Sequence, residues 1–133
     1  MRGACVAAIL AVAGLLSVAC NGLVDPSKNV TETFSGTITP QGFDPHAFSV
    51  TKNGEISIKI TAIAPDPNVP LGVIWAQASS DGTCNGAVLQ SAVASLNFVA
   101  INNQIFQGTY CVLVYDLGIL QANATYTVIV SHP

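Results

Sequence analysis

The sequence predicts an all-β fold, a single antiparallel β-sandwich or jelly roll of about seven or eight strands. Two observations carry this prediction. Short runs of alternating or β-branched apolar residues recur along the chain, and clusters of Gly, Pro, Asn, Asp and Ser separate them. The chain also has 133 residues, of which 50% are apolar and only 8% are charged, and this composition favours one compact domain over a disordered chain.

The first 19 residues have the order of features that defines a secretory signal peptide. Arg2 supplies a positive start, residues 4–19 contain no charge, and the small residues Ser17-Val18-Ala19 precede Cys20. The apolar run is short for a membrane span, and no basic residues follow it directly. We therefore expect residues 1–19 to be removed during export.

The stretch LLSVAC, residues 15–20, resembles the lipobox of bacterial lipoproteins. In that family the cysteine is lipidated, the signal is cut before it, and the new N-terminus is acylated. The resemblance implies that Cys20 carries lipid, and Asn21 after it implies passage to the outer membrane of a bacterial cell envelope. Several acyl chains would anchor the protein firmly, because each buried CH₂ contributes about 0.8 kcal/mol. Ser17 replaces a favoured leucine, so a plain signal peptide with a chance cysteine is the alternative reading.

Residues 20–30 are rich in turn formers and predict a short tether, and residues 31–133 are expected to form the domain. The clearest strand is EISIKI, residues 55–60, because its isoleucines alternate strictly with polar residues. Asn53-Gly54 before it predicts a hairpin in which residues 46–52 pair with residues 55–63. The other expected strands are 31–39 with Phe34 and Ile38 inward, 71–79 at a sheet centre, 95–101, 109–116 and 125–132, with 86–94 as strand or loop.

The charge balance excludes several classes of partner. Without residues 1–19 the chain has 114 residues, with three lysines against seven acids and a formal charge of −4. A nucleic-acid binder needs a basic face, so nucleic acid is not expected as a partner. No Gly-rich phosphate loop joins a strand to a helix, and no cofactor is expected. The expected partners are the membrane, through the lipid, and an envelope protein or polysaccharide.

Two cysteines remain in the exported part of the chain. Cys84 and Cys111 form an even pair, and a disulfide is the default state of such a pair in an exported protein. Two free thiols or half of a metal site are the alternatives. Tyr110 and Cys111 are expected on opposite faces of one strand.

The order of features over residues 31–133 is similar to the bacterial pre-peptidase C-terminal domain. That family has a strand ending in Phe-x-Val, a Gly-led strand of alternating aliphatics, a G-x-Y strand and a closing Y-x-v-x-V strand. The matching residues here are Phe48 and Val50, Gly54 with its isoleucines, Gly108 and Tyr110, and Tyr126 with Val128 and Val130.

Two features depart from the common form of that family. PLGVIWAQAS, residues 70–79, has no acid where an acidic strand is usual, and the two cysteines are additions. The resemblance implies a non-catalytic accessory domain, although no protease precedes it in this chain. Some relatives bind calcium through clustered acids, and this chain lacks the cluster.

Few residues are candidates for a binding site. Asp44 and His46 lie in a predicted turn, and with His132 they could bind zinc if the strands meet. A turn Asp and a surface His are commoner, so no metal site is predicted. Tyr115 and Asp116 end a strand and could contact a ligand, although a strand-end Tyr and a turn Asp are the ordinary outcome.

Trp75 is the only tryptophan, and an exposed ring would suit stacking on a sugar. Its apolar neighbours favour burial instead. No nucleophile motif and no paired carboxylates are evident, so no catalytic residue is assigned and no enzyme is predicted. The sequence thus predicts a structural or binding module that presents loops 40–46, 64–70, 79–86 and 117–124. A carbohydrate-binding module is the first alternative, and a small metal-binding protein or hydrolase is the second.

Overall fold

A computed structural model describes residues 25–133 of the chain. The described part begins with one short 3₁₀ helix and continues as eight β-strands, which confirms the all-β prediction. Cys20 and the predicted signal peptide lie outside the described residues. The elements are η1 (Pro26–Lys28), β1 (Val30–Ile38), β2 (Phe43–Val50), β3 (Gly54–Ala64), β4 (Leu71–Gln77), β5 (Val88–Ala94), β6 (Val99–Ile105), β7 (Gly108–Tyr115) and β8 (Ala124–His132).

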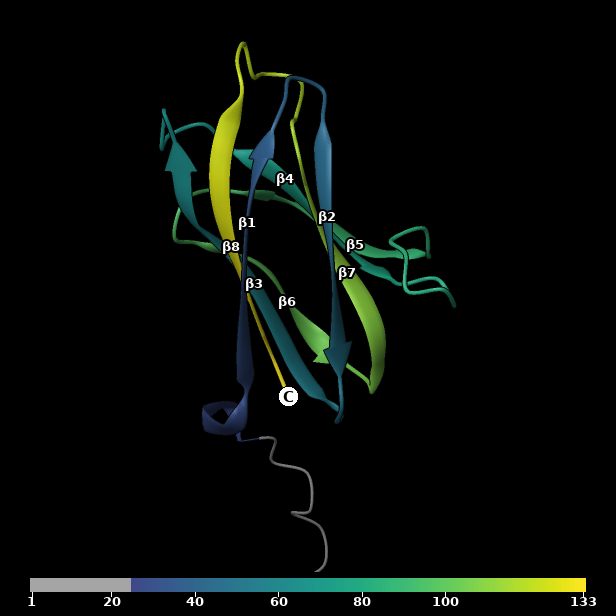
Figure 1. Cartoon of the computed structure of the whole chain (residues 1–133). Helices are drawn as coiled ribbons and strands as arrows, with labels where there is room; N and C mark the ends of the chain where they lie inside the picture. The colour runs from purple at the N-terminus through teal and green to yellow at the C-terminus, as the bar shows by residue number, and fades with distance from the viewer. Residues whose placement is uncertain (1–24) are drawn as a thin grey trace, which may run out of the picture.

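The strands form two antiparallel sheets that pack face to face as a β-sandwich (Figure 1). Sheet A has the order β1-β8-β3-β6 and sheet B has the order β2-β7-β4-β5. Consecutive strands mostly alternate between the two sheets. Within the described chain, β4 and β5 are the only consecutive strands that hydrogen-bond to each other.

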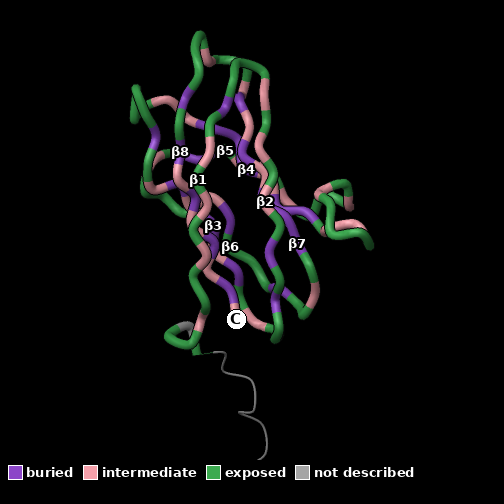
Figure 2. Tube along the Cα trace, viewed as in Figure 1, coloured by how far each residue is buried: buried purple, intermediate pink, exposed green. Residues whose placement is uncertain are grey.

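The core lies between the sheets and is built from alternate residues of the strands (Figure 2). Ile56, Ile58 and Ile60 of β3 are fully buried, as their alternation with polar residues predicts. β4 is flanked by β7 and β5, which confirms the central position expected for it. The segment at 86–94 contains strand β5, and the strand expected at 95–101 lies later, at Val99–Ile105.

The predicted hairpin of residues 46–52 with residues 55–63 is wrong. β2 pairs with β7, and β3 pairs with β6 and β8, so the two segments belong to different sheets. The chain crosses from sheet B to sheet A at residues 51–53. Neither Asn53 nor Gly54 has the positive φ that a two-residue hairpin turn needs, and Gly54 is already the first residue of β3.

The two ends of the sandwich differ in what they carry. The short helix η1 and the C-terminus lie at one end, together with residues 51–53 that join β2 to β3 (Figure 1). Loops 39–42, 64–70 and 117–123 lie at the opposite end, which we call the loop end. None of the helices in residues 25–133 has the length and hydropathy of a membrane span.

Candidate functional site

Asp116 organises the loop end. It follows β7 directly and is 8% exposed. Its carboxylate accepts hydrogen bonds from the backbone N–H groups of Gln41 at 2.8 Å, Ile119 at 3.0 Å and Leu120 at 3.1 Å. The N–H group of Asp116 donates in turn to the carbonyl of Gly42 at 3.0 Å. One residue therefore ties loop 39–42 to loop 117–123.

These hydrogen bonds also set the ionisation of Asp116. The N–H of Gln41 contributes most to lowering the pKa of this carboxyl, and the N–H groups of the 118–120 turn lower the pKa further against the opposing effect of burial. Gln41 has a φ of 60°, in the left-handed region that non-glycine residues seldom adopt. Asp116 thus holds a strained turn in place, and its acceptor capacity is used inside the protein rather than on a ligand.

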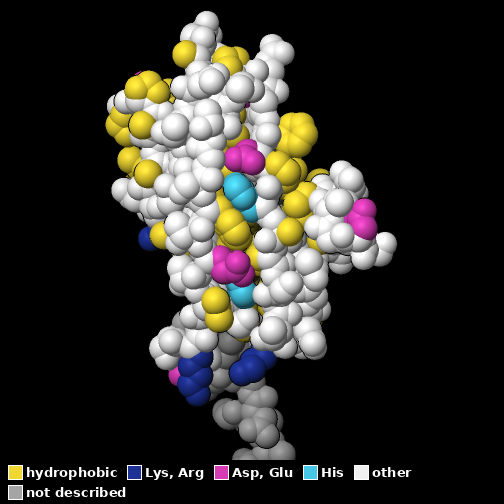
Figure 3. All heavy atoms as spheres, viewed as in Figure 1, with side chains coloured by type: hydrophobic (Ala, Val, Ile, Leu, Met, Phe, Trp, Pro, Cys, Tyr) yellow, Lys and Arg dark blue, Asp and Glu magenta, His cyan; other side chains and the backbone are white. Residues whose placement is uncertain are grey.

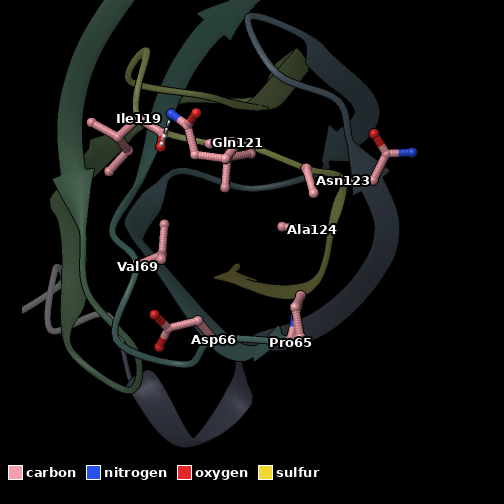
Figure 4. Close-up of a pocket in the computed structure, with 9 residues that line it drawn as sticks. Pro65, Asp66, Val69, Ile119, Gln121, Asn123 and Ala124 are labelled. Carbon is pink, nitrogen blue, oxygen red and sulfur yellow. Dashed lines mark hydrogen bonds between the residues drawn. The ribbon is translucent and has the colours of Figure 1, made fainter.

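A small hollow lies at the loop end (Figure 4). Its volume is about 210 Å³, which suits one inserted side chain better than a drug-sized molecule. Ile119 is 47% exposed on its wall, and the Asp66 carboxylate stands at the loop that closes it. The lining residues are Pro65, Asp66, Val69, Ile119, Leu120, Gln121, Ala122, Asn123 and Ala124.

Trp75 does not form part of any surface site. Its side chain points into the core, is 5% exposed and packs against Tyr110 with ring centroids 5.8 Å apart. Its Nε1–H has no hydrogen-bond partner among residues 25–133. Burial removes the reason to expect a sugar at Trp75, because stacking needs an open ring face.

Tyr115 lies on the outer face of sheet B and is half-buried. Its ring covers Gly72 of β4, where a Cβ atom would overlap the ring. The tyrosine therefore packs flat on its neighbouring strand. Tyr115 and Asp116, which the sequence suggested as ligand contacts, both make structural contacts here.

The Cys84–Cys111 disulfide is present, with a Cα–Cα distance of 5.6 Å and a sequence separation of 27. Cys111 faces outward from sheet B and is buried beneath the loop that carries Cys84. Tyr110 faces the core, so the two neighbours lie on opposite faces as expected. Loop 79–86 is therefore fastened to β7 at the side of the sandwich, away from the loop end (Figure 1).

The histidines lie where β1 of sheet A meets β2 of sheet B, which we call the β1–β2 side. Asp44 and His46 are residues of β2 and not of a turn, so that prediction is wrong. Their alternation with exposed Pro45 turns both side chains toward the gap between the sheets. Figure 3 shows the histidines in cyan, each beside an acidic side chain in magenta, with hydrophobic atoms between them.

Tyr126 joins Asp44 to His46. Its hydroxyl donates to Asp44 Oδ2 at 2.8 Å and lies 2.6 Å from His46 Nε2. Since the single hydroxyl proton goes to the carboxylate, His46 Nε2–H must donate to the tyrosine oxygen. Burial raises the pKa of Tyr126 well above its usual value, and the hydrogen bond to Asp44 and its negative charge raise it further. Gly36 leaves room for this group, because a Cβ there would overlap the Asp44 carboxylate.

A second histidine–carboxylate pair, His132 with Glu32, closes the same side nearer the C-terminus. His132 is 2% exposed and its Nε2 lies 2.8 Å from Glu32 Oε1. Phe48 stacks on the His132 ring with centroids 5.3 Å apart, and Phe34 stacks on His46 at 4.8 Å. Glu32 was not singled out in the sequence, and Phe34 and Tyr126 were named only as strand residues and not as members of a site. Their spacing of two along each strand was the available signal, but the pairing of β1 with β8 was not predictable from it.

The β1–β2 side holds two separate histidine–carboxylate pairs rather than one cluster. Nowhere in residues 25–133 do three His, Cys, Asp or Glu side chains gather closely enough to hold a metal ion. His46 and His132 each use Nε2 in a hydrogen bond to a partner in the protein. The geometry is that of a hydrogen-bonded closure between two sheets.

The comparisons with known proteins bear on the fold. No family model matches the sequence, and no curated protein matches it significantly. Among solved structures, the Yersinia pseudotuberculosis-derived mitogen has a TM-score of 0.59 and 11% identity, covering 79% of this chain and 87% of that chain.

Two further structures share the fold. The pre-peptidase C-terminal domain of a Bacillus anthracis collagenase has a TM-score of 0.54 and 18% identity, covering 76% of this chain and 89% of its own. PliG of Aeromonas hydrophila, a periplasmic inhibitor of g-type lysozyme, has a TM-score of 0.50 and 12% identity, covering 79% and 88%. At these identities the likeness establishes a β-sandwich like that of the pre-peptidase C-terminal domain.

Proposed function

We propose that this chain is an exported, lipid-anchored module of a bacterial cell envelope that binds a protein partner at its loop end without catalysis. The proposal rests on one observation: the N-terminal end of the domain and the three loops lie at opposite ends of the sandwich. The chain enters the domain at the end remote from loops 39–42, 64–70 and 117–123 (Figure 1). A lipid on Cys20 would hold the entry end at the membrane and turn the loop end away from it.

The disulfide supports export, because such bonds persist in oxidising compartments outside the cytoplasm. A periplasmic inhibitor with the same fold is consistent with that location. A mitogen, the pre-peptidase C-terminal domain of a collagenase and a lysozyme inhibitor share this architecture, and these neighbours are compatible with a binding module.

The side chains of the domain support a non-catalytic role. Cys84 and Cys111 are bonded to each other, so neither offers a free thiol. His46 and His132 are occupied by Tyr126 and Glu32, and within residues 25–133 no serine hydroxyl hydrogen-bonds to either ring. A nucleophile needs an adjacent base, and this pairing is missing there.

Two features of the loop end support a partner of a particular chemistry. The hollow accepts one apolar side chain against Val69 and Ile119. The three loops include the exposed Asp66 and no lysine or arginine. A protein that presents an apolar side chain beside a positive charge would match both features.

The anchor is tested by the intact mass of protein extracted from membranes without reductant. We expect a chain that starts at Cys20, carries acyl chains and is two hydrogens lighter than the reduced form. A Cys20→Ser variant should leave the membrane fraction. An unmodified Cys20, or retention of residues 1–19, would overturn the lipoprotein proposal.

The binding end is tested by photo-crosslinking in cells, with the photoreactive residue at Ile119 and, as control, at Thr31 on the outer face of sheet A. We expect one identified envelope protein to be crosslinked from position 119 and not from position 31. Asp66→Lys should reduce the yield of that adduct at least about tenfold, because it places like charges together. Equal crosslinking from both positions, or an adduct unaffected by Asp66→Lys, would sink the proposal.

A further inference from the structure

Four strands lie at the edges of the two sheets, and each exposes backbone N–H and C=O groups along one side. These edges are β1 and β6 in sheet A and β2 and β5 in sheet B. An unprotected edge can pair with a strand of another chain, so proteins guard their edges with charges, prolines or inward-pointing polar residues. The four edges of this protein differ in that protection.

Three edges carry such devices. β2 contains Pro45, which cannot donate a ladder hydrogen bond, and β1 has the inward-facing carboxylate of Glu32. β6 carries the exposed polar run Asn102-Asn103-Gln104, and its pairing with β3 is irregular at Ile58/Lys59. These features make β1, β2 and β6 poor templates for a further strand.

β5 is the least protected of the four edges, because its inward Gln90 is uncharged and its only irregularity is the shift past Leu89 at one end of the strand. The strand reads VLQSAVA and contains no charged residue and no proline. In its pairing with β4 the register shifts between Trp75 and Ala76, so that Leu89 has no partner residue. Gln90 to Ala94 pair with β4 in regular register. Five large apolar residues on β5 and at the start of β6 are 43–72% exposed, namely Val88, Leu89, Val93, Phe98 and Val99.

We propose that β5 pairs antiparallel with β5 of a second copy of this chain, so that the two B sheets join into one eight-stranded sheet. A two-fold axis brings a strand against itself, and such pairing is unfavourable when like charges come opposite each other. β5 has no charge to repel its copy. The uncharged sequence thus favours a second copy over a charged partner.

The area available matches the need of a dimer. Antiparallel pairing places the start of one β5 beside the end of the other, so Phe98 and Val99 approach the beginning of β5 in the second copy. Full coverage of the exposed parts of the five apolar residues in both copies would remove at most about 1,000 Å² from water, which reaches the lower limit for a specific interface. The paired backbone groups add hydrogen bonds to that area.

The full chain as purified, in detergent if it is extracted from membranes, is suited to the test, with its mass measured by sedimentation velocity up to about 100 μM. We expect a dimer for the natural sequence. Val93→Lys and Ser91→Lys, both at exposed positions of β5, should each weaken the dimer at least about tenfold, because each places two lysines close together across the two-fold axis. Thr125→Lys, at an exposed position of β8, is the matched control and should leave the dimer intact.

Folding of each variant is checked by the fluorescence of the buried Trp75. A monomer for the natural sequence, including one that copurifies with a peptide bound along β5, would overturn the proposal. A dimer that survives both β5 substitutions while they fold normally would overturn it as well. Neither outcome depends on binding at the loop end, so this inference and the proposed function can fail separately.

Discussion

The β1–β2 side and the opposite β5–β6 side close the same gap between the two sheets in different ways. On the β1–β2 side, Asp44, Tyr126 and His46 form a hydrogen-bonded row, and Glu32 holds His132. On the β5–β6 side, one amide pair crosses the gap, Asn103 Nδ2 to Gln90 Oε1 at 3.2 Å.

The difference shows two ways in which the open sides of a β-sandwich can be treated. The β1–β2 side is satisfied within one chain, and its inward polar groups make further strand pairing unfavourable. The β5–β6 side leaves apolar residues in water. The disulfide belongs to neither side, because it fastens the loop of Cys84 to the outer face of β7. We expect perturbation of the two sides to have different consequences, namely loss of stability at the first and loss of association at the second.

The largest effect is expected from removal of the disulfide that precedes β5. The double substitution Cys84→Ala and Cys111→Ala should lower the free energy of unfolding by about 3 kcal/mol, because the bond restricts the unfolded chain across 27 residues. Urea denaturation measures this loss. Reduction of the natural protein should reproduce it, and equal midpoints with and without reductant would contradict the prediction.

On the β1–β2 side, Tyr126→Phe should lower the free energy of unfolding by about 1–3 kcal/mol, because it leaves Asp44 and His46 without their shared partner in a half-buried place. Urea denaturation again provides the measurement. Tyr115→Phe is the control, since its hydroxyl has no hydrogen bond to residues 25–133, and it should change stability by less than about 0.5 kcal/mol. Similar losses in both variants would contradict the assigned network.

The same tyrosine predicts a dependence on alkaline pH. Burial, followed by the hydrogen bond to Asp44, raises the pKa of Tyr126 in the folded protein above its value in the unfolded chain. Its contribution to stability is therefore complete below about pH 10 and is lost as the pH rises toward the folded-state pKa. Tyr126→Phe should show a shallower decline of stability above that pH, and an unchanged decline would exclude this origin.

A smaller effect is expected at the loop end from Asp116→Asn. The N–H groups of Gln41 and of the following turn lower the pKa of Asp116, so its contribution is present above about pH 4 and is lost as the pH falls through the folded-state pKa. The variant should lose less stability on acidification than the natural protein does. It should also speed amide exchange at Gln41, whereas Gln121→Ala, an exposed neighbour, should keep the natural acid profile. Unchanged exchange at Gln41 would contradict the role given to Asp116.

The smallest effect is expected from Val93→Lys on the stability of the monomer. The residue is exposed, so the free energy of unfolding should change by less than about 0.5 kcal/mol at concentrations where the protein is monomeric. Thermal denaturation of the dilute protein measures it. A loss above about 1 kcal/mol would show that β5 supports the fold itself.

The elements of this fold could largely be predicted from local patterns. The strict alternation at 55–60 and the β-branched runs that became β7 and β8 identified strands because burial on one face imposes a period of two. Pairing could not be predicted in the same way. Asn53-Gly54 is a local signal, and the hairpin turn it favours does not form here, because the choice of sheet depends on strands that are distant in sequence.

The candidate sites likewise divide into those that local sequence patterns predict and those that depend on distant strand pairing. Cys84 and Cys111 were paired correctly because the export context leaves few alternatives for two cysteines. The row on the β1–β2 side was missed because Tyr126 meets Asp44 across 82 residues, a contact that only the β1–β8 and β2–β7 pairings create. Pro45 also made Asp44 and His46 resemble turn residues, since an edge strand tolerates proline and a local pattern does not reveal an edge.

The position of β8 has a consequence for the order in which the chain can fold. The last strand lies between β1 and β3, so sheet A cannot assemble until nearly the whole chain is available. Pairings of such long sequence separation form slowly, because the loop-closure entropy is lost before the contacts are gained. A newly made chain would therefore remain without its native core until residues 124–132 emerge. That delay suits a protein proposed to cross a membrane before it folds.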